Sequence, residues 1–144
     1  MRILVLNGPN LNLLGLREPE IYGRETYTDL IDRIHRTASE LGVEVTCRQS
    51  NHEGMLMDWI QESYGVYDGI VLNPAAYTHT SIALLDALKA VNIPTVEVHI
   101  SDTGKRESYR QISYVRQACV KTVMGLGLDG YEVALRYLVS ILKD

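Results

Sequence analysis

Residues 1–23 read MRILVLNGPNLNLLGLREPEIYG, and in this stretch an apolar run at 3–7 breaks into a segment punctuated by glycine and proline. An apolar run bounded by turn residues predicts a buried strand, and the segment after it predicts a long loop. Connections between a strand and a helix usually span roughly 2 to 6 residues, so an irregular loop over about 11–25 needs a functional reason. The leucines of this loop argue against disorder. We therefore expect a lid over a binding site.

Further apolar runs predict four more strands, at 43–49, 69–73, 95–99 and 120–124. Helical spacing of apolar residues separates them, at 28–41, 53–64, 81–91 and 131–142. Gly42 is suited to end the first helix, and Thr80 is the expected cap of the third. Strands that alternate with helices predict a doubly wound α/β fold, a five-stranded parallel sheet covered on both faces. We expect the flavodoxin-like strand order 2-1-3-4-5.

Composition favours a single soluble domain that spans residues 1–144. The chain has 144 residues, of which 46% are hydrophobic, enough for one core. Its net charge of −4, without a basic run, argues against nucleic acid or an anionic membrane as a partner. No apolar run is long enough to span a membrane, no signal peptide is visible, and Cys47 and Cys119 form no CxxC pair. We expect a cytoplasmic protein with a small-molecule ligand.

Strands 1, 3 and 4 become central in this order, and ligands of open parallel sheets bind beyond the carboxyl ends of such strands. Asn7, Asn10 and Asn73 stand at or just after two of these ends, and His99 and Ser101 at the third. Two amides, an imidazole and a hydroxyl are therefore expected to converge beneath the lid. The alternative for Asn7 and Asn73 is that each merely helps to form a turn beside glycine or proline.

Glu97 and His99 lie two residues apart in an apolar strand, so their side chains are expected on the same face. A buried carboxylate beside an imidazole fixes its orientation and favours its protonated form. This arrangement predicts that His99 is a general acid. The alternative is a structural ion pair in the core.

Arg17 and Tyr22 flank a proline on the expected lid. A cation within about 4 to 6 Å lowers the pKa of a tyrosine by ~1 to 3 units, and exclusion of water strengthens the attraction. Closure of the lid could therefore make Tyr22 a base. The alternative is that Arg17 is a solvated charge and Tyr22 a packing residue.

Two other kinds of site find little support. Residues 125–130 read GLGLDG, a literal GxGxxG, but the chain ends after one helix, before the second strand and acidic residue that a dinucleotide site requires. Those glycines are better explained by a tight turn. The four histidines show no metal-ligand spacing, so no metal is expected.

The chain resembles the type II 3-dehydroquinate dehydratases over essentially its whole length. The motifs that carry the resemblance are Asn7-Gly8-Pro9-Asn10-Leu11, Arg17-Glu18-Pro19 with Tyr22-Gly23, Arg48-Gln49-Ser50-Asn51, Asn73-Pro74-Ala75-Ala76-Tyr77-Thr78-His79-Thr80-Ser81, Glu97-Val98-His99-Ile100-Ser101, and Gly125-Leu126-Gly127 with Gly130-Tyr131. The resemblance implies a trans elimination of water from 3-dehydroquinate, through an enolate, to give 3-dehydroshikimate without a cofactor. It places the enzyme in the shikimate pathway of aromatic amino acid biosynthesis or in quinate breakdown.

The resemblance also implies a role for each site residue. Tyr22 would take the proton from C2 with Arg17 stabilising it, and His99, backed by Glu97, would protonate the leaving hydroxyl. Asn10 would hold a water near the enolate oxygen. The residues implied in substrate binding are Asn73, His79, Ile100, Ser101 and Arg110.

Asp86 belongs, by the resemblance, to the site of a neighbouring subunit in a trimer, and four trimers form a dodecamer. The family pattern after Ser101 is altered at 102–109, DTGKRESY, which puts contacts to the substrate carboxylate or between subunits in doubt. Two rival interpretations stay open: a nucleotide-binding module that uses residues 125–130, and a non-catalytic relative that serves as a scaffold.

Overall fold

The computed structural model describes residues 1–16 and 18–143, with the side chain of Tyr22 also outside the description. Its five strands are β1 (Arg2–Asn7), β2 (Glu44–Gln49), β3 (Gly69–Asn73), β4 (Thr95–His99) and β5 (Lys121–Met124). All pair in parallel, in the order β2-β1-β3-β4-β5. The predicted doubly wound, flavodoxin-like sheet is confirmed. No helix among the described residues is long and apolar enough to cross a membrane.

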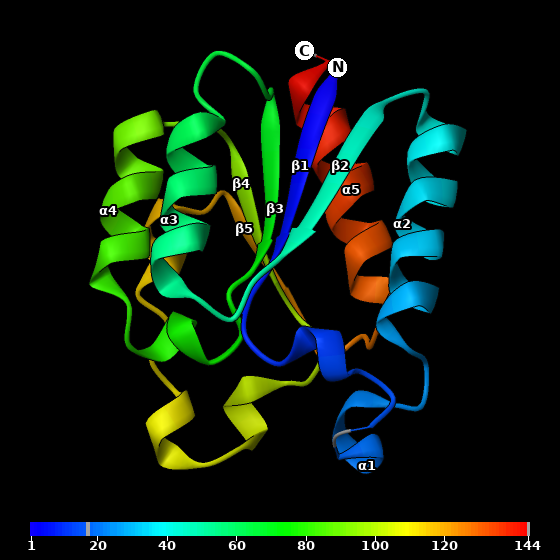
Figure 1. Ribbon diagram of the computed structural model, residues 1–144, viewed down its shortest axis with the longest axis vertical. Helices are drawn as coiled ribbons and strands as arrows, with labels where there is room; N and C mark the ends of the chain where they lie inside the picture. Colours follow the sequence, from blue (N-terminus) through cyan, green and yellow to red (C-terminus); the bar gives the residue numbers. More distant parts are fainter. Residues whose placement is uncertain (17, 144) are drawn as a thin grey trace.

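Four long helices cover the sheet, as predicted: α2 (Tyr27–Leu41), α3 (Glu53–Glu62), α4 (Ile82–Val91) and α5 (Asp129–Leu142). Helices α2 and α5 lie on one face and α3 and α4 on the other (Figure 1). Each face has its own apolar core, because the strands alternate their side chains: Val96 and Val98 point toward α5, whereas Leu4 and Leu6 point toward α3 and α4.

The caps of two helices show how local sequence sets their ends. Thr26 and Asp29 form a reciprocal capping box at the start of α2, and Gly42 ends this helix with a φ of 70°. The predicted cap of α4 at Thr80 is wrong: the hydroxyl of Ser81 accepts from the backbone N–H of Leu84. Thr80 instead closes the preceding 3-10 turn η2 (Ala75–His79), so its backbone is already committed.

The carboxyl ends of the strands open onto a layer of short elements at the lower end of the molecule (Figure 1). The expected lid is not irregular throughout, since it contains the 3-10 turn η1 (Leu11–Leu13) and the helix α1 (Pro19–Tyr22). Residues 100–119, between the predicted strands at 95–99 and 120–124, form η3 (Thr103–Lys105), η4 (Ser108–Arg110) and η5 (Val115–Ala118). Leu11 of η1, Thr103 of η3 and Arg110 of η4 line a hollow at the strand ends, whereas η5 packs against α4.

Candidate active site

His99 and Glu97 form a buried pair at the end of β4. Nε2 of His99 lies 2.5 Å from Oε2 of Glu97, and both side chains are almost wholly excluded from solvent. The prediction that the two side chains share a face of the strand is confirmed. Burial by itself raises the pKa of the Glu97 carboxyl, but hydrogen bonds from His99 and Arg116 outweigh it and lower that pKa to about 2. Glu97 is therefore an ionised acceptor.

Four further side chains surround Glu97, and sequence reasoning found none of them. Arg116 of η5 donates from Nε to Oε1 at 3.0 Å and from Nη2 to Oε2 at 3.1 Å. The hydroxyls of Ser113 and Thr78 donate to Oε2, and that of Thr122 donates to Oε1. In the sequence these four residues stand out only by being polar or charged. The segment around Ser113 and Arg116 has no periodic pattern of apolar residues from which its position in the fold could be predicted.

A cavity of about 150 Å³ lies beyond the ends of β1, β3 and β4. It brings together most of the predicted site residues, and it adds Arg106. The residues that line it are Pro9, Asn10, Leu11, Asn73, Ala75, Ala76, His79, His99, Ile100, Ser101, Thr103, Arg106 and Arg110. The predicted site at the carboxyl ends of the central strands is therefore a real hollow.

Asn7, Asn73 and Tyr131 form a buried hydrogen-bonded cluster, of which Asn73 lines the cavity. Asn7 and Asn73 lie side by side across β1 and β3. The hydroxyl of Tyr131 donates to Oδ1 of Asn7 at 2.6 Å and accepts from Nδ2 of Asn73 at 2.8 Å. Oδ1 of Asn73 accepts from the backbone N–H of Ala75, as a turn-forming asparagine does, yet Asn73 also lines the cavity. Asn73 therefore forms the turn and also lines the cavity.

His79 also lines the cavity. Its Nδ1 donates to the backbone carbonyl of Ile112 at 2.6 Å, which orients the ring. Burial lowers the pKa of His79, and the charges of His99 and Arg110 lower it further against the opposing effect of that hydrogen bond. His79 is thus held toward its neutral form.

Two arginines supply positive charge to the cavity. Arg106 donates from Nη1 to Oγ of Ser101 at 3.3 Å, and Arg110 donates from Nε to Oε2 of Glu107 at 2.9 Å. The stretch that carries them is two 3-10 turns rather than a continuous helix, yet both side chains reach the same hollow. Guanidinium groups placed in this way suit a carboxylate ligand.

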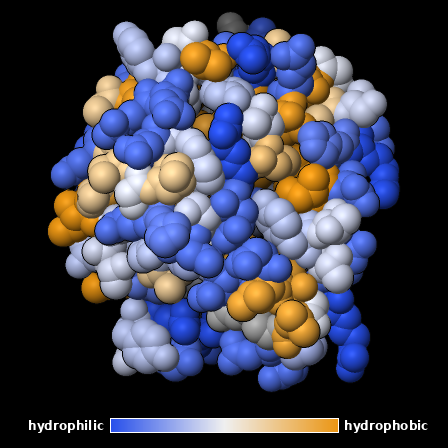
Figure 2. Space-filling model, in the orientation of Figure 1, coloured by the Kyte–Doolittle hydropathy of each residue, from blue (hydrophilic) through white to orange (hydrophobic). Residues whose placement is uncertain are grey.

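The lid approaches the cavity through its first residues. Asn10 lines the cavity with a left-handed backbone, φ 70°, and its N–H donates to Oδ1 of Asn51 at 3.0 Å. Leu11 and Leu14 are buried, whereas Leu16 is 80% exposed, and Figure 2 shows hydrophobic side chains gathered at this lower end of the molecule. Arg17 lies outside the described residues.

Glu97, although bonded to His99, does not itself line the described cavity. Tyr22 ends α1, but its side chain lies outside the description. Asp86 is exposed on α4 and does not line the cavity.

The Dehydroquinase class II family model matches residues 1–139. The chain belongs to this family. It is 51% identical to the 3-dehydroquinate dehydratase of Clostridium acetobutylicum, over 99% of both chains, and 52% identical to that of Variovorax paradoxus, over 96% of this chain and 98% of the relative. The crystal structure of the type II dehydroquinase from Butyrivibrio crossotus superposes with a TM-score of 0.94 at 50% identity, covering 96% of this chain and 97% of that one. The chain is therefore an enzyme of the hydro-lyase class, as predicted.

The glycines at 125–130 serve the dehydroquinase fold as turn residues. Gly125 and Gly127 have φ values of 79° and 61°, a region that side chains rarely adopt. The N–H of Gly127 donates to the carbonyl of Ile100 at 3.1 Å, which ties the turn to the end of β4. The interpretation of GLGLDG as a tight turn is confirmed.

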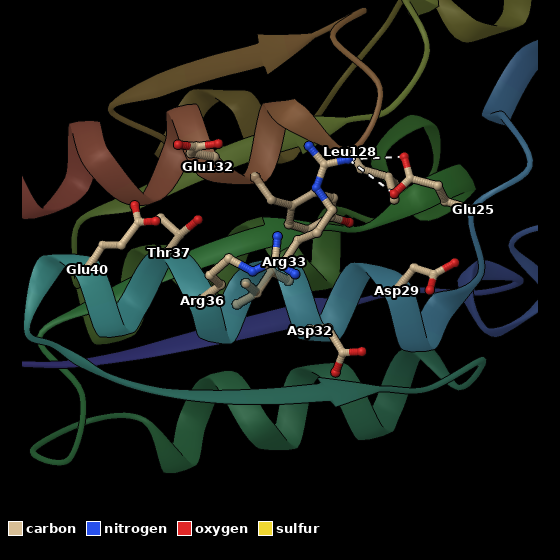
Figure 3. A pocket seen from close by; sticks show the side chains of 11 residues that line it. Glu25, Asp29, Asp32, Arg33, Arg36, Thr37, Glu40, Leu128 and Glu132 are labelled. Carbon is tan, nitrogen blue, oxygen red and sulfur yellow. Dashed lines mark hydrogen bonds and ion pairs between the residues drawn. The ribbon is translucent and has the colours of Figure 1, made fainter.

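A second, more open hollow of about 410 Å³ lies between α2 and α5 (Figure 3). Charged side chains line it, and they bind one another: Arg33 pairs with Glu25 at 3.0 Å and also with Asp129. Exposed pairs of this kind contribute little and mark a solvated groove. Among the hollows of the described residues, the smaller cavity is lined by His99 of the buried His99–Glu97 pair and by polar strand ends, and it is the candidate active site.

Proposed function

We propose that this chain converts 3-dehydroquinate into 3-dehydroshikimate by removing water through an enolate, without a cofactor. The observation that supports this proposal most directly is the 2.5 Å contact between His99 and an ionised Glu97 at the wall of the cavity. A carboxylate only accepts, so Nε2 of His99 carries a proton, and Nδ1 is the nitrogen that can exchange one with the substrate. His99 is therefore our proposed acid.

Tyr22 is the proposed base. Its phenolate takes a proton from C2 of the substrate, the electrons of that C–H bond move into the enolate, and the C1 hydroxyl leaves as water with the proton of His99. Arg17 would stabilise both the phenolate and the transition state. For Tyr22 and Arg17 the support comes from their match to the family motif, and for Tyr22 also from the position of α1 at the end of the molecule where the strands end (Figure 1).

The remaining walls of the cavity suit a polyhydroxylated carboxylate. We propose that Arg110 and the backbone at Ile100 and Ser101 bind the carboxylate and its neighbours, with Asn73 and His79 on the ring hydroxyls. Tyr131 uses only one of the two N–H groups of the Asn73 amide, so the other can reach a ligand. Asn10 would hold a water near the enolate oxygen.

We further propose that the subunits form trimers and that four trimers form a dodecamer, with Asp86 reaching the site of a neighbour. The exposed position of Asp86 on α4 fits a contact between chains. Gel filtration with light scattering tests the assembly, since a monomer would contradict it. A cytoplasmic location and the choice between the shikimate and quinate pathways stay predictions.

The decisive experiment follows the ultraviolet absorbance of the conjugated product when the purified protein meets 3-dehydroquinate without added metal or nucleotide. We expect absorbance growth that the His99→Asn variant loses and that borohydride treatment leaves unchanged, because no lysine imine forms. Inactivation by borohydride would contradict the enolate mechanism. No growth of absorbance at all would favour a non-catalytic relative that serves as a scaffold. Saturable binding of a nucleotide would favour a nucleotide-binding module.

A further inference from the structure

Arg116 approaches the His99–Glu97 pair from behind. Its guanidinium donates to both oxygens of the Glu97 carboxylate, at 3.0 Å and 3.1 Å, while Nε2 of His99 donates to Oε2. Arg116 is not among the residues that line the cavity. It therefore touches the pair without reaching the place where a substrate would bind.

The geometry gives this arginine two effects on His99. A guanidinium bound to both oxygens fixes the plane of the carboxylate, which holds the accepting lone pair on the ring nitrogen of His99. It also compensates the charge of Glu97, a side chain with 0% exposure. Without that compensation the full negative charge of the carboxylate would act on the ring of His99.

We propose that Arg116 is a positioning residue for the acid His99 and acts through Glu97 alone. This inference rests on the proposed function, because it assumes that His99 donates its proton in the reaction. The hydroxyls of Ser113, Thr78 and Thr122 complete the surroundings of the carboxylate. They remain when Arg116 is replaced, so Glu97 keeps acceptor contacts and the fold has a means to survive the change.

Arg116→Met tests the inference through the separation of kcat from KM. Misplacement of a catalytic group by about 1 Å costs up to ~100-fold in rate, so we expect kcat to fall ~10- to 100-fold. KM should stay within about twofold, because the cavity walls are unchanged. The kcat of Arg116→Lys should lie between that of the wild type and that of Arg116→Met. An ammonium supplies the charge but cannot bind both oxygens in the same plane.

Chemical rescue adds a readout that a loss of stability does not explain. The side chain of Arg116 is 39% exposed, so a small cation has a route to the vacated position in Arg116→Ala. Guanidinium on the order of 10 mM, far below concentrations that unfold proteins, should restore part of kcat. Sodium at the same ionic strength should not.

Arg136→Met is the matched control. Arg136 is also half-exposed and also bound to two carboxylates, those of Glu40 and Glu132, but it lies on α5 away from the cavity. Its replacement should leave kcat and KM unchanged. An inactive wild-type protein would overturn the proposed function itself. An active wild-type protein whose kcat survives Arg116→Met, or whose Arg116→Ala variant guanidinium cannot rescue, would overturn only this inference.

Discussion

The proposed acid and the proposed base are carried by two differently built parts of the molecule. His99 ends a buried strand, and its neighbour Glu97 accepts six hydrogen bonds from five side chains. Tyr22 ends α1, a helix of four residues between Glu18 and Gly23, both of which have a positive φ. The strand end is therefore organised by the sheet before any ligand binds, whereas the lid depends on a few local anchors.

The largest effect should come from removing each reactive group in turn. General acid or base catalysis contributes typically 10²- to 10⁴-fold, so Tyr22→Phe and His99→Asn should each lower kcat by about that factor. The rest of the cavity is organised without His99, so the His99→Asn variant should bind the substrate with the affinity of the wild type. Steady-state kinetics with isothermal titration measure both quantities. A Tyr22→Phe variant with full kcat would remove the lid from the mechanism.

The anchors of the lid should differ sharply in their contribution to stability. Leu14 is 4% exposed in the α2–α5 core, and Leu16, two residues on, is 80% exposed. Leu14→Ala should lower the free energy of unfolding by about 2 to 5 kcal/mol, whereas Leu16→Ala should change it by less than about 0.5 kcal/mol. Urea denaturation measures both variants. Equal effects would mean that the lid is not held by its buried leucine.

The Glu97 carboxylate beside the proposed acid His99 should make the free energy of unfolding depend on pH. Its pKa is about 2 in the folded chain against an ordinary 4.5, so the unfolded state binds more protons in this range. The contribution is complete above about pH 4.5 and is lost as the pH falls toward 2; it amounts to about 3 kcal/mol. Unfolding free energies measured across this window should fall less steeply for Glu97→Gln. Parallel slopes for the two proteins would contradict the assignment.

The same contrast explains which parts the sequence could predict. Strands β3 and β4 were predicted to the residue, because an apolar run between turn residues specifies both ends. The Glu97–His99 contact followed from the two-residue period of one strand. Arg116 could not be found in this way, since it meets Glu97 across 19 residues of chain and reaches it from a 3-10 turn without a period. The helix in the lid was missed because four residues are too short to show one.

The smallest effect should come from the buried cluster of Asn7, Asn73 and Tyr131, where one hydroxyl joins two strands. Tyr131→Phe keeps the buried ring but leaves Oδ1 of Asn7 without its 2.6 Å donor and Nδ2 of Asn73 without its 2.8 Å acceptor. A buried polar group left unsatisfied costs about 1 to 3 kcal/mol, which urea denaturation resolves. Because Asn73 then loses its orientation, KM should rise more than kcat falls. The exposed Tyr64→Phe is the control, with no change expected in either quantity, and an unaltered KM in Tyr131→Phe would show that Asn73 is held by its bond to Ala75 alone.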